Sequence, residues 1–289
     1  MLKMKTMKQP SIEHIVIAYG DRLDYHFGAK YQIIKGFSDG FYSNKSAISV
    51  LTDRPDLYDM LPVNICEISE LQKEEWSMGG QQHFGIKLGC LRLSREKSEA
   101  EYILMMDTDL FWKRHPAKLI QRIGAGEMAM YKNEGFILKS RNKSIQQFET
   151  GLDGKSISIN EGFPAYQLDY KSEMWASNVV SITAPQLAVL EHAFELFKAL
   201  EPKVNAHTVE QFAISEASRL HSVKKIEASR YCFSWSSIGR KEYANTVLRK
   251  FFTGNKNARF EELVERAQTI SIKRPLMVNI RQKIDRLTR

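Results

Sequence analysis

A short apolar run that ends abruptly in two acidic residues constrains the fold of this 289-residue chain more than any other feature. Residues 102–106 read as a buried strand, and Asp107-Thr108-Asp109 follow it directly. Ligands of open α/β sheets bind beyond the carboxyl ends of the strands, so polar residues here are candidates for a binding site. Side chains alternate along a strand, so Asp107 and Asp109 are expected to point broadly the same way. Such a pair suits Mg²⁺ or Mn²⁺, which prefer oxygen ligands.

The order of the remaining segments predicts an α/β fold with a mostly parallel sheet flanked by helices. Strands are expected at residues 13–18, 46–51, 62–68, 102–106, 127–131, 174–183 and 222–228. Helices are expected at residues 25–38, 84–97, 184–200, 208–220, 239–252 and 258–270. Two polar stretches, residues 69–82 and 139–172, predict loops. A weak boundary at Thr253-Gly254-Asn255 divides a main domain, residues 1–253, from a basic, helical extension, residues 254–289.

The charge of the chain favours anionic partners, because 42 Lys and Arg residues face 34 acidic ones. The excess is large in residues 273–289, where either a solvated tail or a peripheral contact with an anionic membrane is expected. Nucleic acid is not an expected partner, since no aromatic residues interleave with this basic cluster. No apolar run is long enough to span a bilayer, and a cytoplasmic protein is expected. The three cysteines (Cys66, Cys90 and Cys232) are expected to be buried thiols.

Taken together, these landmarks resemble GT-A glycosyltransferases. The approach to the acidic motif, Tyr102-Ile103-Leu104-Met105-Met106-Asp107-Thr108-Asp109, is most similar to glycosyltransferase family 8. The resemblance extends more loosely to Trp175-Ala176-Ser177-Asn178-Val179-Val180 and to Glu210-Gln211-Phe212-Ala213. The resemblance covers residues 13–250, where the matching segments follow one another in the same order.

The resemblance implies a transferase that takes a sugar from a nucleoside diphosphate, with a UDP-sugar as the first expectation, and passes it to a glycan, lipid or protein acceptor. It implies that Asp109, assisted by Asp107, holds Mn²⁺ or Mg²⁺ between the donor phosphates, offsetting the charge of the departing diphosphate. The donor-binding residues that it implies are Ala18, Tyr19, Asp21, Thr52, Asp53, Lys87, Asp107, Thr108, Arg240 and Lys241.

Glu210 and Gln211 match a pair that lies near the reacting sugar in related enzymes, which makes them the candidate catalytic residues. Each assignment has a structural alternative. Thr52 and Asp53 also suit a turn, Lys87 also suits an exposed helix face, and Glu210 is favourable near the start of a helix. The family leans towards retention of the anomeric configuration, and no residue stands out as an inverting base.

The chain departs from the family pattern in two places. The family supplies a late histidine as a third metal ligand, but this sequence has no histidine after His221. The small polar segment that lines the acceptor side is altered at Ala176-Ser177-Asn178. Two other functions therefore stay open. One is a sugar-phosphate nucleotidyltransferase, although Tyr19-Gly20-Asp21-Arg22 is poor in glycine for a phosphate loop. The other is a non-catalytic GT-A-like scaffold or binding protein.

Overall fold

The computed structural model describes residues 10–42, 47–160, 162–273 and 275. The chain forms two compact units, each assembled from three separate segments of the sequence. Unit 1 comprises Met1–Ile15, Ile68–Met106 and Pro116–Arg230, and unit 2 comprises Val16–Glu67, Asp107–His115 and Tyr231–Arg289. The division between them falls within the first strand, β1 (Ile12–Ile17). The expected boundary after residue 253 stays a prediction.

Unit 1 contains a sheet in which most side chains of the inner strands are buried. Its strands run in the order β10 (Lys224–Glu227), β6 (Glu127–Phe136), β9 (Glu173–Thr183), β4 (Tyr102–Met106) and β1. The pairs β1–β4 and β10–β6 are parallel, whereas β9 is antiparallel to both of its neighbours. Two irregularities interrupt the register of β6 against β9. A separate antiparallel pair consists of β7 (Ser156–Ile157) and β8 (Tyr166–Gln167).

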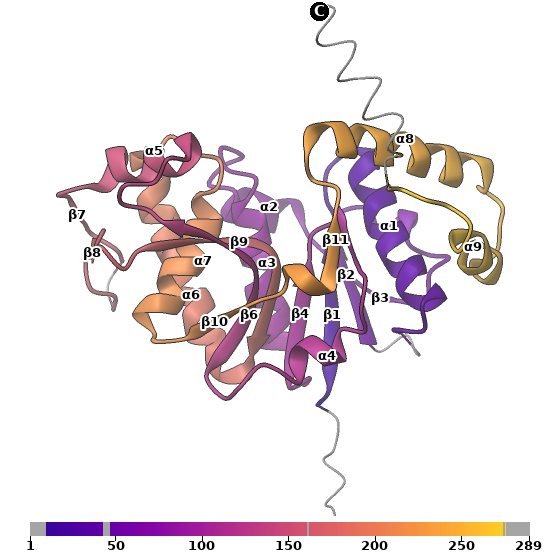
Figure 1. Ribbon diagram of the computed structural model, residues 1–289, viewed down its shortest axis with the longest axis horizontal. Helices are drawn as coiled ribbons and strands as arrows, with labels where there is room; N and C mark the ends of the chain where they lie inside the picture. Colours follow the sequence, from indigo (N-terminus) through magenta and orange to yellow (C-terminus); the bar gives the residue numbers. More distant parts are fainter. Residues whose placement is uncertain (1–9, 43–46, 161, 274, 276–289) are drawn as a thin grey trace, which may run out of the picture. The chain divides into compact units, whose positions relative to one another are not determined.

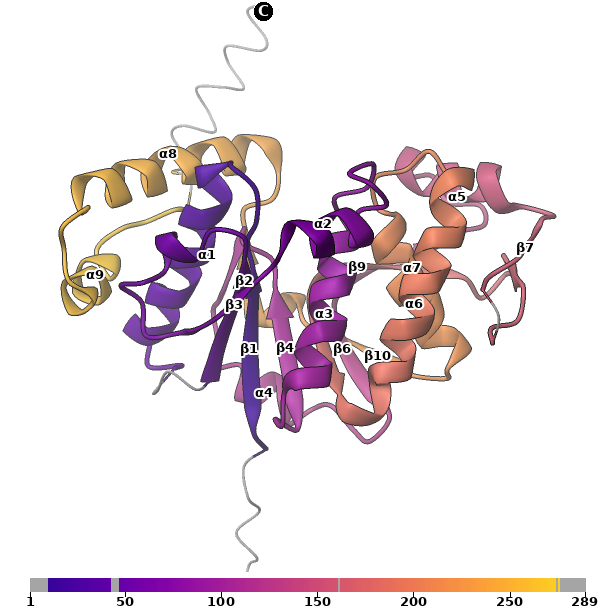
Figure 2. The ribbon, with the colours of Figure 1, turned by 180° about the vertical axis from the view of Figure 1, so that it is seen from behind.

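Three helices of unit 1 lie side by side against this sheet: α3 (Gly85–Lys97), α6 (Leu187–Leu200) and α7 (Val209–Leu220) (Figure 2). Helix α6 shows why they pack there. Its buried residues Leu190, Ala193, Phe194 and Phe197 recur at intervals of three and four, which places them on one face. The shorter helices of unit 1 are α2 (Glu70–Trp76), α4 (Ala117–Ile120) and α5 (Lys143–Leu152).

Unit 2 combines the end of β1 with the strands β2 (Ile48–Thr52) and β3 (Asn64–Glu67), which are parallel to each other. A small antiparallel ribbon pairs β5 (Leu110–Trp112) with β11 (Cys232–Ser234). Helices α1 (Leu23–Ser38), α8 (Ile238–Gly254) and α9 (Phe260–Ala267) pack together (Figure 1). Aromatic contacts join them: Phe27 stacks on Phe252 at 5.2 Å, and Phe37 meets Phe260 edge-on at 5.1 Å. Short 3₁₀ turns occur at Pro55–Leu57, Ala184–Gln186, Glu201–Lys203 and Ser229–Tyr231.

The structure confirms the α/β class, the mostly parallel sheet and the flanking helices. Both expected loops are wrong in part. Residues 69–82 contain α2, whose start is fixed by a capping box in which Ser69 and Gln72 bond each other's backbone. Residues 139–172 contain α5 and the β7–β8 pair. The two strands of the small ribbon were not expected from the sequence, because each has only three residues.

No helix within the described ranges combines the length and apolar character needed to cross a bilayer. All three cysteines are described and none forms a disulfide; Cys90 and Cys232 are buried, and Cys66 is half-buried. Most of the basic tail at residues 273–289 lies outside the described residues, so the expected membrane contact stays a prediction.

Candidate functional site

The acidic motif lies in unit 2, on the turn that leads from β4 into β5. Asp107, Thr108 and Asp109 are all half-buried. Helix α1 holds the backbone of this turn, because the Gln32 side-chain amide donates to the carbonyl oxygens of Asp107, at 3.1 Å, and of Leu110, at 3.2 Å. The backbone that carries the two carboxylates is therefore held against a helix.

Close packing of α1 against the motif depends on a glycine. A Cβ atom added to Gly28 would lie only 2.2 Å from the carbonyl oxygen of Thr108, so no larger residue fits without movement. Neither Gly28 nor Gln32 was expected at the site. No local sequence signal identifies them, because their role arises from a turn about eighty residues farther along the chain.

Asp109 lies against Lys241, a residue that the resemblance assigns to the donor phosphates. The Lys241 ammonium is 3.2 Å from Asp109 Oδ2, and it also lies 5.4 Å from the centre of the Tyr25 ring. The side chains are 15% exposed for Asp109 and 33% exposed for Lys241. The structure thus brings together two candidate residues that are 132 positions apart. Arg240, the neighbour of Lys241, is exposed.

Helix α8, which carries Lys241, is fastened within unit 2 at several points. The backbone N–H of Trp235, just before the helix, donates to the carbonyl oxygen of Asp109 at 3.1 Å. Farther along the helix, Arg249 Nη2 and Asn245 Nδ2 donate to the Asp24 carboxylate at 2.9 and 3.3 Å. These bonds fix the start of α8 beside the acidic motif.

A second group of candidate residues follows the ends of β1 and β2. The backbone N–H of Gly20 donates to both oxygens of Asp53, at 3.0 and 3.1 Å, which ties the two strand ends together. Thr52 is fully buried, and its hydroxyl accepts a bond from the backbone of Arg54. Of the others, Ala18 is buried, Tyr19 is half-buried and Asp21 is exposed. Asp53 and Thr52 thus both bond to the backbone of the turns here.

The remaining candidates gather in unit 1 as a buried polar cluster. Lys87 on α3 donates to the Ser177 hydroxyl on β9 at 3.0 Å, and that hydroxyl donates to the Glu210 carboxylate on α7 at 2.9 Å. The Lys87 ammonium is also 3.8 Å from Glu210. Lys87 and Glu210 are 8% and 4% exposed, so the alternative of an exposed helix lysine is wrong.

Gln211 extends this cluster towards β6. Its side-chain oxygen accepts from the backbone N–H of Ser177 at 3.4 Å, and its nitrogen donates to Glu134 at 2.9 Å. Packing around the Glu134 carboxyl raises its pKa, which the bond from Gln211 partly opposes. Sequence reasoning missed Glu134, because it stands at the irregular part of β6 among exposed residues.

Around Asp109 the protein itself offers few ligands for a divalent cation. No three His, Cys, Asp or Glu side chains gather as a possible metal site in the described part of the chain. One oxygen of Asp109 already faces the Lys241 ammonium, and the sequence offers no later histidine. A divalent ion at Asp109 would have to share this carboxylate with the Lys241 ammonium and take its remaining ligands from phosphate and water. The Mn²⁺ or Mg²⁺ site therefore stays a prediction from the resemblance.

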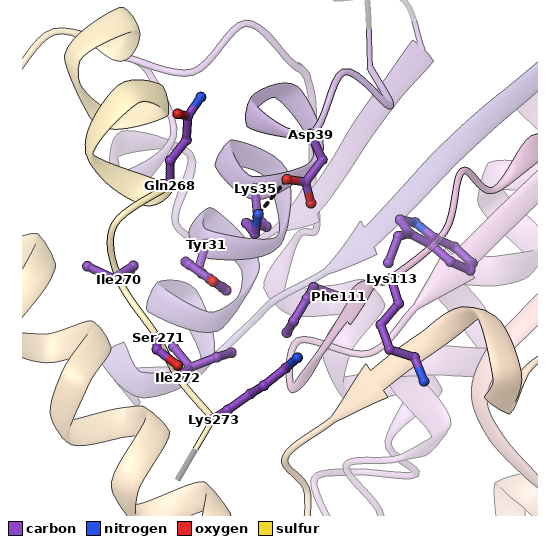
Figure 3. A pocket seen from close by; sticks show the side chains of 11 residues that line it. Tyr31, Lys35, Asp39, Phe111, Lys113, Gln268, Ile270, Ser271, Ile272 and Lys273 are labelled. Carbon is purple, nitrogen blue, oxygen red and sulfur yellow. Dashed lines mark hydrogen bonds and ion pairs between the residues drawn. The ribbon is translucent and has the colours of Figure 1, made fainter. Parts of the chain in front are cut away.

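A hollow of about 430 Å³ opens elsewhere in unit 2 (Figure 3). Side chains of α1 and of the segment after α9 line it on one side, and side chains of β5 line it on the other. Its polar lining includes Lys35, paired with Asp39, together with Lys113 and Lys273. None of the candidate site residues lines this hollow, so it has no assigned part in donor binding.

No family model and no curated protein matches this sequence. In three dimensions the chain is similar to the galactosyltransferase LgtC, crystallised with donor and acceptor sugar analogs. The two are 9% identical with a TM-score of 0.48, over 74% of this chain and 72% of LgtC. It is also similar to mouse xyloside xylosyltransferase 1, with 12% identity and a TM-score of 0.44 over 75% of this chain and 85% of the mouse chain.

A third similar structure is a Bacillus anthracis protein described as a glucose-1-phosphate thymidylyltransferase in complex with sucrose. It is 10% identical, with a TM-score of 0.41, and the match covers 83% of this chain and 96% of that chain. The first two of these structures are glycosyltransferases and the third is a nucleotidyltransferase. At these identities and TM-scores the similarities assign no activity to this chain.

Proposed function

We propose that this chain is a glycosyltransferase that moves a sugar from a nucleoside diphosphate, a UDP-sugar in the first instance, to a glycan, lipid or protein acceptor. The observation that carries the proposal is the 3.2 Å contact between Asp109 and Lys241. The resemblance assigns Lys241 to the donor phosphates and Asp109 to the metal ion between them. Their meeting across 132 residues of sequence supports a single ligand for both.

The donor diphosphate is assigned to the start of α8 and the acidic motif. Lys241 and Arg240 supply positive charge, and the first turn of the 17-residue helix adds the positive end of its dipole. These charges would offset the negative charge that develops on the departing diphosphate. Asp107 and Thr108 would complete this end of the donor site.

The base and ribose are assigned to the turn after β1. Tyr19 would stack on the base and Asp21 would accept from a ribose hydroxyl, with Ala18 beside them. Thr52 and Asp53 would act mainly by shaping the turn, since both already bond to backbone N–H groups.

Glu210 and Gln211 are assigned to the reacting sugar. The Glu210 carboxylate is buried and held by the Ser177 hydroxyl, with the Lys87 ammonium 3.8 Å away. A carboxylate fixed in this way suits the stabilisation of an oxocarbenium-like centre. Transfer of a hexose with retention of configuration follows from the resemblance and belongs to the same proposal. So does a cytoplasmic location. The divalent metal cofactor that the resemblance also implies is kept apart from this proposal, because the Lys241 ammonium already faces Asp109.

The competing candidate is a non-catalytic GT-A-like scaffold. One observation favours it: Asp109 and Glu210 both already face lysine ammonium groups, which is also how purely structural ion pairs are satisfied. A ligand-binding measurement on the donor side separates the two functions.

The test is thermal unfolding with a panel of UDP-, GDP-, CMP- and dTDP-sugars, each with and without Mn²⁺. A ligand at about 100 times its Kd stabilises the folded state by about 2.7 kcal/mol, which corresponds to a rise in the melting temperature of about 4–5 °C for a chain of this size. We expect a UDP-sugar to produce this rise and Asp109→Asn to remove it. Asp59→Asn is the matched control, because Asp59 is an exposed aspartate of the same unit.

A chain that no nucleotide sugar stabilises is not a nucleotide-sugar transferase. If a donor does bind, hydrolysis of the donor distinguishes the enzyme from the scaffold. The enzyme slowly releases UDP, and Glu210→Gln slows this release while the donor still raises the melting temperature. Binding without any release of UDP, with mixed sugar acceptors present, favours the scaffold.

A further inference from the structure

We propose that the Lys241 ammonium group takes the place of a metal ion at Asp109, so that the chain binds a nucleoside diphosphate without a divalent metal ion. The inference rests on the proposed function, because it concerns how the same donor site neutralises phosphate charge. The observation behind it is that Asp109, one of the two carboxylates of the acidic motif, already faces the Lys241 ammonium group.

The position of the Lys241 ammonium is the one that a bound cation would take on Asp109. Its Nζ atom lies 3.2 Å from Oδ2, within reach of a direct ionic hydrogen bond. The Tyr25 ring, 5.4 Å from Nζ, adds a second electron-rich neighbour. The pair is partly shielded from water, since the Asp109 side chain is only 15% exposed. Shielding strengthens such a pair over one on the open surface.

The backbones on both sides of this pair are fixed. The carbonyl of Asp109 accepts from the Trp235 N–H at 3.1 Å, and the N–H of Lys241 donates to the Ser237 carbonyl at 2.8 Å in the first turn of α8. Arg249 fastens the other part of the helix to Asp24. The contact is therefore held by the docking of α8, in contrast to pairs between long side chains on a mobile surface.

A divalent cation on Asp109 would have to displace this ammonium or lie within a few ångströms of it, and like charges at that separation repel strongly. The ammonium has three donors, so one bond to Asp109 leaves donors for phosphate oxygens. Arg240 and the start of α8 add further positive charge beside it. The chain thus carries, in its own side chains, the charge that a metal ion would bring.

The test is calorimetric titration of the full-length protein with UDP, once in EDTA and once in excess Mn²⁺. We expect the two Kd values to agree within about twofold. Lys241→Met should weaken binding in EDTA by about tenfold and recover most of it in Mn²⁺, because the variant exposes the carboxylates to the metal. Electron paramagnetic resonance gives a separate readout: Mn²⁺ should be bound by the variant with UDP, and not by the unmodified protein with UDP.

Two controls belong with the variant. Lys250→Met removes an exposed lysine from the same helix and should leave the Kd for UDP unchanged in both buffers. Lys241→Arg keeps the charge and should bind UDP in EDTA better than Lys241→Met does. If EDTA abolishes the binding of UDP to the unmodified protein, the inference is wrong and the proposed function still stands. The absence of UDP binding in both buffers overturns the two together.

The effect of EDTA on UDP binding by the unmodified protein tests the inference without any variant, so poor folding of Lys241→Met does not obscure the result. Lys241→Met that folds and binds UDP in EDTA as tightly as the unmodified protein also overturns the inference, because Lys241 would then contribute no charge to the ligand.

Discussion

At the scale of single residues, the close approach of α1 to the acidic motif depends on the absence of a Cβ atom at Gly28. An alanine at position 28 would place Cβ 2.2 Å from the Thr108 carbonyl oxygen, so the helix or the turn must move. We expect Gly28→Ala to lower the free energy of unfolding by about 1–3 kcal/mol. Equilibrium denaturation in urea measures this change.

Gly254→Ala is the matched control for that experiment. Gly254 is the last residue of α8, and no described heavy atom lies within 4 Å of a Cβ added there. Alanine is the better helix former, so this variant should be unchanged or more stable by up to about 1 kcal/mol. Equal destabilisation of the two variants would contradict the close approach at Gly28.

His26 is a second residue whose chemistry is set by its neighbours. Its Nε2 lies 2.8 Å from the Gly20 carbonyl oxygen and its Nδ1 lies 2.9 Å from the Tyr58 hydroxyl. The neutral ring satisfies both if Nε2–H donates to the carbonyl and Nδ1 accepts from the hydroxyl. Burial lowers the pKa of His26 below its ordinary value of 6.5, which the bond to Gly20 partly opposes.

This lowered pKa predicts a loss of stability in mild acid. Between the lowered pKa and 6.5 the unfolded chain binds more protons than the folded protein does, so the free energy of unfolding falls as the pH drops below 6.5. His26→Asn removes this dependence. We therefore expect the unmodified protein to lose more stability than the variant between about pH 7.5 and about pH 5.5 in urea denaturation. An equal loss in both proteins would show that His26 does not titrate in this way.

At the scale of elements, the buried polar cluster joins α3, β9 and α7 through Lys87, Ser177 and Glu210. Removing one charge leaves the other buried without compensation. Lys87→Met should therefore lower the free energy of unfolding by about 3–5 kcal/mol. Lys87→Met with Glu210→Gln should be less destabilised than the sum of the single variants, giving a coupling energy above about 1 kcal/mol.

An exposed pair provides the comparison. Lys224 on β10 lies 2.8 Å from Glu127, but its side chain is 73% exposed. Lys224→Met should cost no more than about 1 kcal/mol, because solvent screens surface ion pairs. If Lys87→Met and Lys224→Met lower the free energy of unfolding equally, burial does not determine how much the polar cluster in unit 1 stabilises the fold.

Elements were predictable from the sequence where a local pattern was long enough. The stripe at Phe27, Tyr31, Ile34 and Phe37 predicted α1, and apolar runs predicted the main strands. The loop expected at residues 139–172 was wrong because its polar composition hid Ile145, Phe148 and Leu152, which recur at helical spacing and are buried in α5. The β5–β11 ribbon has no such signal, since its two strands pair across more than a hundred residues.

The candidate site stays a prediction. Its position after a strand singled out Asp109, whereas the resemblance to the family singled out Lys87, Glu210 and Lys241. Which of them meet depends on the packing of whole helices, and the Asp109–Lys241 and Lys87–Glu210 contacts follow from that packing. Supporting residues such as Gln32 act through backbone atoms of distant segments, so their own sequence surroundings do not reveal them.

At the scale of the whole molecule, α9 packs on α1 within unit 2. Phe260 of α9 contacts Phe37 of α1, and Leu263 and Ala267 are buried. A chain ending at residue 253 should therefore be less stable than one ending at residue 273 by about 2 kcal/mol or more, because burial of these side chains is lost. Thermal and urea unfolding of the two shortened chains measure the difference. Equal stability would support a separable extension, as the sequence suggested.

The separation between Asp109 and Lys241 also bears on how the protein is made. A ribosome adds residues from the amino end. The acidic motif therefore leaves the exit tunnel well before Lys241, which lies 132 positions farther along the chain than Asp109. During that interval the aspartate has only its local neighbours and water. The pair can form only once α8 has emerged and docked, which makes it one of the last contacts of synthesis. Nascent chains arrested before residue 241 should therefore lack any affinity for UDP that depends on this pair.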